Sequence, residues 1–300
     1  MILIGSRAAT FFFDDFRVAR DWDVVTTAEE LHAWVKKSLH KIKTKKFNYN
    51  ETKLGICLLD GTRFEFEIIY PNSSNELLVD LRKKYRYNGY DVADPVSLYL
   101  IKKSHIHYPV WWRKNIEDYH YLKTKIGTID DAHQQFYELR KKETDEKHKG
   151  RKTNLNMTNE EFFEKSEKAV KRVYNHDDLH IATCYYDEPL YDSLKLDKKK
   201  AAIDKNLFDK LSDTDKIKTV QEECYAIALE RKVIPALESG EEVFAEDAFV
   251  HALERISTTL TSGWFRDFAI ENYFSIRNYD KDYVSDFIEA VDSGKIKRLV

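Results

Sequence analysis

Two aspartates near the N-terminus, Asp21 and Asp23, lie two residues apart in a short segment of aromatic and β-branched residues. Such a composition is typical of a β-strand, in which residues i and i+2 point to the same face. The two carboxylates are therefore expected to project side by side, and their mutual repulsion costs free energy. A divalent cation such as Mg²⁺ removes that cost because it prefers oxygen ligands. The spacing predicts that Asp21 and Asp23 bind Mg²⁺ or Mn²⁺ and serve in catalysis.

A third carboxylate is expected from the segment 64–69, in which Glu65 and Glu67 alternate with apolar residues. The alternation places both glutamates on one face of a strand. Two metal ions that clamp the attacking and leaving oxygens of a phosphoryl group commonly need more than two carboxylates. Both glutamates are candidate catalytic residues, and the alternation leaves open which of them reaches the metal. Glu67 is included with the aspartates in the expected set of metal ligands.

A candidate phosphate-binding turn follows the apolar segment 1–4. Gly5 and Ser6 can offer backbone N–H groups and a hydroxyl group to a phosphate. Arg7 comes next, and Lys102 lies on an expected helix further along the chain. Positive side chains of this kind can neutralise a triphosphate or a departing pyrophosphate. We therefore expect Gly5, Ser6, Arg7 and Lys102 to bind a nucleotide.

The order Gly5-Ser6, then Asp21-x-Asp23, then a separate acidic strand resembles the DNA polymerase beta-type nucleotidyltransferase superfamily over residues 1–70. The resemblance implies a Mg²⁺-dependent enzyme that moves a nucleoside monophosphate from a nucleoside triphosphate, such as ATP, to an acceptor hydroxyl and releases pyrophosphate. It implies that Gly5 and Ser6 hold the triphosphate. The acceptor is left open: a nucleic-acid end, a protein or a small molecule. A catalytically silent nucleotide-binding regulatory protein is an alternative with the same fold.

A second candidate cluster contains His176, Asp177 and His180. On a helix, His176 and His180 are four residues apart and share one face. The three side chains are candidates for binding the acceptor substrate. The His-Asp pair also resembles that of the HD-type metal-dependent phosphohydrolases, which gives an alternative function. The simplest alternative is an ordinary polar helix with a capping residue.

Composition limits the class of protein. The chain has 300 residues, of which 42% are hydrophobic and 34% charged, with a formal net charge of −3. Overall charge therefore does not attract it to nucleic acid, and any such contact needs a local basic patch. No apolar run approaches the ~20 residues of a membrane span, and Met1 opens directly into an expected strand without a basic leader. We expect a cytoplasmic protein with no membrane partner.

The pattern of elements predicts an α+β protein. A mixed-sheet, nucleotidyltransferase-like domain is expected over residues 1–125, and a helical domain over 126–300 with a charged loop near 141–158. The expected elements of the first domain are strands at 1–4 and 21–25, a helix opened by a capping box at 27–30, a lysine-rich turn at 41–46, a hairpin at 54–59 and 64–70, and helices at 75–85, from 95 and at 113–123. Further helices are expected at 160–174, 215–237, 245–260 and 283–291.

Overall fold

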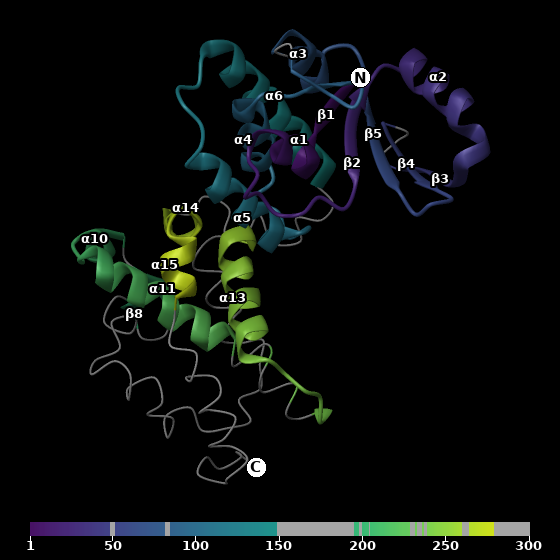
Figure 1. Ribbon diagram of the computed structural model, residues 1–300. Helices are drawn as coiled ribbons and strands as arrows, with labels where there is room; N and C mark the ends of the chain where they lie inside the picture. Colours follow the sequence, from purple (N-terminus) through teal and green to yellow (C-terminus); the bar gives the residue numbers. More distant parts are fainter. Residues whose placement is uncertain are drawn as a thin grey trace. The chain divides into compact units, whose positions relative to one another are not determined.

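The computed structural model describes most of the first half of the chain and part of the second (Figure 1). The chain divides into two compact units, the first formed by Met1–Ile106 and Lys114–Arg151, the second by His107–Arg113 and Lys152–Val300. The described residues are 1–48, 52–81, 85–148, 195–197, 200–203, 205–228, 232, 236, 239–259 and 264–278.

A seven-stranded mixed sheet organises the first unit. Its strands are β1 (Ile2–Ile4), β2 (Trp22–Thr26), β3 (Ile42–Asn48), β4 (Lys53–Leu58), β5 (Arg63–Ile68), β6 (Arg86–Tyr87) and β7 (Tyr90–Val92). Their order across the sheet is β3-β4-β5-β2-β1-β7-β6. The pairs β2–β5 and β1–β7 are parallel, and the other neighbours are antiparallel. The two acidic segments found in the sequence, on β2 and β5, are therefore adjacent strands.

Helices cover both faces of this sheet (Figure 1). On one face, Trp34 of α2 (Ala28–Ser38) contacts Phe64 and Phe66 of β5, with ring centroids 4.9 Å away in both cases. On the other face, α1 packs against β1, β2 and α4, and α6 packs against α3 and α4. The bounds are α1 (Gly5–Phe12), α3 (Ser74–Leu81), α4 (Pro95–Lys103), α5 (Trp112–Lys123) and α6 (Asp131–His148). The alternation of apolar and acidic residues on β5 thus separates an aromatic layer from an acidic face.

Local sequence signals account for two helix starts. Thr27 and Glu30 form the predicted capping box, in which the Thr27 hydroxyl accepts from the Glu30 N–H and the Glu30 carboxylate accepts from the Thr27 N–H. The Asp94 carboxylate caps α4 by accepting from the N–H groups of Val96 and Ser97. Both predictions are confirmed.

Two expectations about charged segments were wrong. Residues 42–48 form the edge strand β3 rather than a lysine-rich turn, because alternate residues of an edge strand can face solvent. Residues 141–148 of the expected loop are instead the end of α6, which begins at Asp131, and residues 149–158 lie outside the described residues. That helix buries Phe136, Tyr137 and Arg140 along one side, and its charged side chains occupy the other. α6 therefore belongs to the first unit, which extends past residue 125.

The described part of the second unit is mostly helical, with α10 (Lys205–Asp209), α11 (Asp213–Ala228), α13 (Ala245–Thr259), α14 (Trp264–Glu271) and α15 (Tyr273–Arg277). α11 packs on α13 and α15, and α13 packs on α14. The short antiparallel pair β8 (Lys195–Asp197) and β9 (Lys200–Ile203) was not expected from the sequence. The coarse expectation of a sheet-bearing N-terminal part followed by a helical C-terminal part is therefore confirmed.

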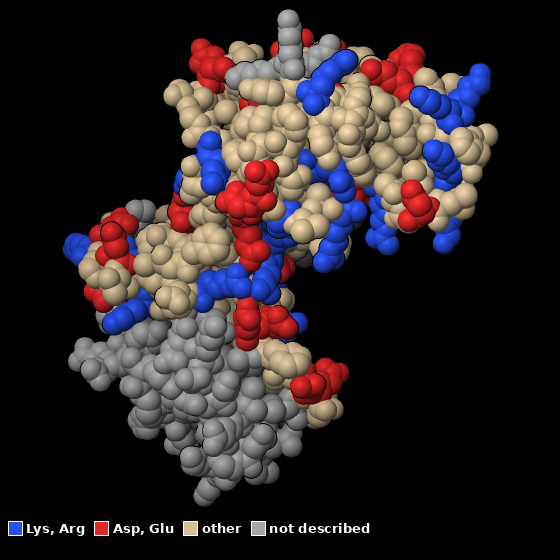
Figure 2. All heavy atoms as spheres, viewed as in Figure 1, with Lys and Arg blue, Asp and Glu red and all other residues tan. Residues whose placement is uncertain are grey.

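Acidic and basic side chains both occur over the visible surface of the described residues, in keeping with the small net charge (Figure 2). None of the described helices combines the length and the apolar character that crossing a bilayer requires.

Candidate active site

The start of α1 lies against the Asp23 carboxylate. The antiparallel pairing of β1 and β2 puts Ile4 opposite Asp23, and the chain enters α1 at the next residue. Gly5 has a φ of 68°, a conformation that residues with a Cβ rarely adopt. A Cβ at this position would lie 2.0 Å from Oδ2 of Asp23. The backbone conformation therefore favours glycine here, and a Cβ would force the Asp23 carboxylate to move.

The N-terminus of α1 has no side-chain cap. Ile4 occupies the N-cap position, and the first turn contains no acidic residue. The first N–H groups of a helix have no partner within it, and the helix dipole makes this end favourable for anions. Ser6, which is buried, follows immediately. A phosphate placed at this end could accept hydrogen bonds from backbone N–H groups.

Three carboxylates influence one another at this point of the sheet. The parallel pairing of β2 and β5 places Glu65 opposite Asp23, and Asp21 precedes β2. Burial raises the pKa of Asp23 to about 7, and the negative charges of Asp21 and Glu65 add to the rise. The structure thus brings together both predicted aspartates and one of the two predicted glutamates. Their mutual repulsion is the kind that a bound cation relieves.

Among the described residues, no three His, Cys, Asp or Glu side chains are gathered into a ready-made cage for a metal ion. Glu65 is exposed, and Asp21 and Asp23 are partly exposed, so the acidic face is open. Mg²⁺ is commonly held by one or two carboxylates together with waters and substrate phosphates. The carboxylate oxygens of Asp21, Asp23 and Glu65 are ligands of the kind that such a cation prefers.

Glu67 has different partners from those expected of a metal ligand. It is buried, its Oε2 lies 2.8 Å from Nη1 of Arg140, and its Oε1 forms an ion pair with Lys53. These two positive charges hold the pKa of Glu67 well below its usual range despite its burial. Glu65 and Glu67 share a face but stand ~7 Å apart along the strand, and only Glu65 is opposite Asp23. The position of Glu65 therefore fits a third metal ligand better than that of Glu67, which is engaged by Arg140 and Lys53.

Asp118 of α5 positions two cations near the carboxylates. Its oxygens accept from Nε and Nη2 of Arg17 at 2.6 and 2.7 Å, and Nζ of Lys102 lies 2.8 Å from Oδ2. Arg17 also donates to the hydroxyl of Ser6. Lys102 is close enough to Asp23 to lower its pKa against the larger opposing effects. A phosphate-binding role for Lys102 fits this position.

Lys114 is a third cation in the same region. Burial and the positive charges of Arg17 and Lys102 lower its pKa, and the negative charges of Asp21 and Asp23 act in the opposite direction. Arg17, Lys102 and Lys114 thus bring positive charge to the acidic face and the start of α1. Asp118 was not predicted, because it meets Arg17 and Lys102 only through the tertiary fold.

Arg7 holds the chain segment that leads into β2. Its guanidinium lies over the Trp22 ring, 4.4 Å from the centroid, and donates to the backbone oxygens of Asp21 and Ala19 at 3.2 Å. These contacts fix the chain just before β2. Arg7 therefore supports the position of Asp21 through its Nε and Nη2 donors, and its nucleotide contact stays a prediction.

The predicted cluster of His176, Asp177 and His180 lies outside the described residues.

Two protein-family models match parts of the chain. A family model described as Domain of unknown function (DUF7275) matches residues 97–289, which is more than half of the chain. The chain belongs to the DUF7275 family. A second model, Domain of unknown function (DUF7277), matches residues 1–82. No curated protein matches the chain.

The candidate site of this DUF7275 family member is built from both matched segments. The carboxylates of Asp21, Asp23 and Glu65 fall within the DUF7277 match, whereas Lys102 and Asp118 fall within the DUF7275 match. The ion pair between Glu67 and Arg140 likewise joins the two segments. The first compact unit therefore combines the DUF7277 match with residues 97–106 and 114–151 of the DUF7275 match.

Proposed function

We propose that this chain is a metal-dependent nucleotidyltransferase. The observation that carries the proposal is the grouping of Asp21, Asp23 and Glu65 at the start of α1, accompanied by Lys102 and other cations. Phosphoryl-transfer sites need negative ligands for a divalent cation and positive groups for the phosphates. Few structural roles need both kinds of charge around an uncapped helix N-terminus.

The proposed substrate is a nucleoside triphosphate. Its phosphates accept hydrogen bonds from the N–H groups at Gly5 and Ser6, where the helix dipole favours negative charge. Arg17, Lys102 and Lys114 add positive charge on the same side. Asp118 does not touch the nucleotide; it holds Arg17 and Lys102 in position.

The proposed reaction joins an acceptor oxygen to the α-phosphorus. The bond between that phosphorus and the oxygen bridging to the β-phosphate breaks, and pyrophosphate leaves with the electron pair. A bound Mg²⁺ or Mn²⁺ would supply charge neutralisation and activation of the acceptor hydroxyl. Asp21 and Asp23 would hold the cation, and Glu65 would accept the acceptor's proton and pass it to water. Lys102 and Lys114 would stabilise the charge that develops on the leaving group.

The resemblance to the polymerase beta-type nucleotidyltransferases agrees with this arrangement. Gly5 and Ser6 directly follow β1, the Asp-x-Asp segment leads into β2, and the third carboxylate lies on the parallel neighbour β5. The sheet is mixed and carries helices on both faces. These features support the proposed fold family, and the acceptor stays open among a nucleic-acid end, a protein and a small molecule.

An assay of label transfer tests the proposal. Each α-³²P-labelled nucleoside triphosphate is incubated with the full chain, Mg²⁺ or Mn²⁺ and a cell extract, and label in macromolecules or small products is followed together with pyrophosphate. We expect metal-dependent transfer that Asp23→Asn abolishes and Glu29→Gln, a change of an exposed residue on α2, leaves intact. Nucleotide binding without pyrophosphate release would instead support a silent binding protein. Activity on phosphate esters that survives in Asp23→Asn would support the phosphohydrolase alternative.

A further inference from the structure

A basic surface lies at the edge of the sheet, over the end of α2, the strand β3 and the segment that joins them. Six of the eleven residues from 36 to 46 are lysine and none is acidic, in a chain whose formal net charge is −3. In Figure 2, blue side chains lie over these elements at the right of the view. We call this surface the basic edge, and it consists of the exposed side chains of Lys36, Lys37, Lys41, Lys43, Lys45 and Lys46.

The acidic residues of α2 and of the turn after β4 do not neutralise the basic edge. Within the part of the chain that the structure describes, none of its six lysines forms an ion pair. The acidic residues of α2 are in its first turn, whereas Lys36 and Lys37 are in its last. After β4, the pKa of Asp60 is lowered mainly by hydrogen bonds from Thr62, and Lys41 adds to the decrease. The carboxylate of Asp60 offsets at most one of six positive charges.

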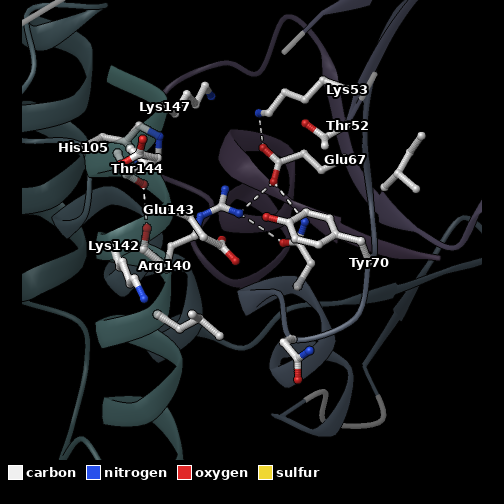
Figure 3. A pocket seen from close by; sticks show the side chains of 15 residues that line it. Thr52, Lys53, Glu67, Tyr70, His105, Arg140, Lys142, Glu143, Thr144 and Lys147 are labelled. Atoms are coloured by element: carbon white, nitrogen blue, oxygen red, sulfur yellow. Dashed lines mark hydrogen bonds and ion pairs between the residues drawn. The ribbon is translucent and has the colours of Figure 1, made fainter. Parts of the chain in front are cut away.

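The glutamates of β5 are also unable to neutralise the basic edge. Glu67 is held by Lys53 and Arg140 (Figure 3). Glu65 is two strand spacings, about 10 Å, from β3, and the exposed Arg63 lies two residues before it on the same strand. The basic edge therefore keeps a net positive charge after the described acidic residues of α2, β5 and the turn between β4 and β5 are counted.

One face of β3 combines a lysine with an exposed aromatic ring. Lys45 and Phe47 are two residues apart, so their side chains share a face. They lie opposite Ile56 and Leu54 of β4, on the side of the sheet where Trp34 of α2 packs. Phe47 is 55% exposed. An exposed aromatic ring beside positive side chains is a platform on which a nucleic-acid base can stack.

The other face of β3 continues into the candidate active site. Lys46 lies opposite Gly55 of β4, and Gly55 lies opposite Glu65. Glu65 in turn lies opposite Asp23. Residues directly opposite one another share a face, so these positions form one row across the sheet. The row spans three strand spacings, about 14 Å, and a polymer bound at the basic edge can therefore extend over the acidic face.

Two simpler roles account for only part of the basic edge. Lysines on an edge strand commonly prevent pairing with another sheet, but Lys36 and Lys37 lie on α2 and not on that strand. An acidic peptide that joined the sheet as an extra strand would lie along β3 alone. A flexible polyanion can contact both elements and offer a base to Phe47. The combination favours single-stranded nucleic acid over an acidic peptide.

We propose that the basic edge binds single-stranded nucleic acid. The phosphates contact the lysines of β3 and of the end of α2, and a base stacks on Phe47. The overall charge of the chain is slightly negative, so binding depends on this local surface. The proposal does not depend on nucleotidyl transfer, because the contact needs neither a triphosphate nor a divalent cation.

The test is fluorescence anisotropy of labelled oligo(dT) and oligo(U), each about 16 nucleotides long, titrated with the full chain without metal or triphosphate. The test variant is Lys45→Gln/Lys46→Gln. The matched control is Lys141→Gln/Lys142→Gln, which removes the same charge from an adjacent pair of exposed lysines on α6. We expect the test variant to bind roughly five- to tenfold more weakly, as for the loss of two exposed ion contacts. The control should bind as the unaltered chain does.

Salt dependence and stacking provide two further readouts. Each phosphate contact to a single strand contributes about 0.7 to the slope of log affinity against log salt concentration, so Lys45→Gln/Lys46→Gln should reduce the slope by about 1.4. Phe47→Ala should weaken binding about fivefold or more. It should leave the slope unchanged, because a stacked base releases no counterion.

Several outcomes overturn the proposal. They are the absence of binding of both oligonucleotides at low salt, and equal affinity in the two double variants. Equal affinity for polyglutamate of matched length would reject nucleic acid in favour of an acidic protein. Binding of phosphatidylserine vesicles in place of the oligonucleotides would reject it in favour of a membrane surface.

Photocrosslinking of the unaltered chain to an oligonucleotide containing 4-thiouridine replaces the variants if one of them fails to fold. We expect crosslinks within residues 36–47. Crosslinks confined to other parts of the chain would reject the proposal.

Discussion

Gly5 and Asp23 are in such close proximity that no side chain fits between them: a Cβ on residue 5 would stand 2.0 Å from Oδ2 of the aspartate. The atom that would have to yield is the end of the Asp23 side chain rather than backbone. Replacement of Gly5 would thus displace the most perturbed carboxylate of the proposed site. This relationship connects the glycine of the first turn to the acidic pair through geometry, and not only through their order in the sequence.

We expect Gly5→Ala to abolish nucleotidyl transfer. The positive φ of 68° adds a backbone cost of about 1–2 kcal/mol to the free energy of folding. Gly61→Ala is the matched control, because Gly61 has a φ of 86° and no atom within 4 Å of the added Cβ. Both variants should lose similar stability in urea unfolding, whereas only Gly5→Ala should lose transfer activity. Equal activity of the two variants would show that the Gly5–Asp23 contact is not needed.

Asp23 should make the stability of the metal-free protein depend on pH. Its pKa is raised from 3.8 to about 7 in the folded state, so the folded state binds more protons than the unfolded state between these values. Stability is then greatest below pH 3.8 as far as this group is concerned, and it falls as the pH rises through 7. The full effect is roughly 2–4 kcal/mol, reduced from the nominal value because Asp23 keeps some exposure to solvent.

The variant Asp23→Asn should remove this dependence. At pH 8 without metal it should be more stable than the unaltered chain, and Mg²⁺ should raise the melting temperature of the unaltered chain but not that of the variant. Chemical unfolding at pH 5 and pH 8 measures the first effect, and thermal unfolding with and without Mg²⁺ measures the second. A variant that is less stable at both pH values would mean that the carboxylate is satisfied by contacts within the protein.

Glu65 and Glu67 should respond in opposite ways to substitution by glutamine. Glu67→Gln leaves the buried Arg140 without its negative partner and should cost about 3 kcal/mol of stability. Glu65→Gln, at an exposed position, should change stability by less than about 0.5 kcal/mol, yet it should abolish transfer because Glu65 is the proposed third carboxylate. Unfolding curves and transfer assays on both variants check this. Full activity in Glu65→Gln would remove that residue from the mechanism.

Asp118→Asn should weaken nucleotide binding, although Asp118 itself does not contact the nucleotide. The buried carboxylate holds Arg17 and Lys102, and its loss leaves these two cations without their shared partner. We expect about 2 kcal/mol of lost stability and a higher KM for the nucleoside triphosphate, with a smaller change in kcat. Steady-state kinetics over a range of nucleotide concentrations separates the two effects. A lower kcat with an unchanged KM would assign Asp118 to the chemical step instead.

Signals within a few residues were sufficient to predict several elements of the fold. The capping box at Thr27 and the Asp94-Pro95 pair predicted two helix starts, and alternation on β5 predicted its two faces. α6 was missed because its charged side chains mask a buried side at Phe136 and Arg140. This segment is helical because one side of it is buried in the tertiary fold, which its charged composition does not reveal.

Part of the candidate site could also be predicted from residues that are close in the sequence. Asp21 and Asp23 are close in the sequence, so spacing alone identified them. The choice between Glu65 and Glu67 depends on the register of β5 against β2 and on an arginine 73 residues further along, neither of which alternation reveals. Arg17 and Asp118 are 101 residues apart and meet only in the folded unit.

The central claim, that Asp21, Asp23 and Glu65 bind a divalent cation, is tested most directly by electron paramagnetic resonance of Mn²⁺ at pH 8. Titration of the full chain follows the loss of the free-ion signal, with Asp23→Asn and the exposed control Glu29→Gln measured alongside. The account predicts that the unaltered chain and Glu29→Gln bind Mn²⁺ and that Asp23→Asn does not. Equal uptake of Mn²⁺ by the unaltered chain and Asp23→Asn, or none by either, would contradict it.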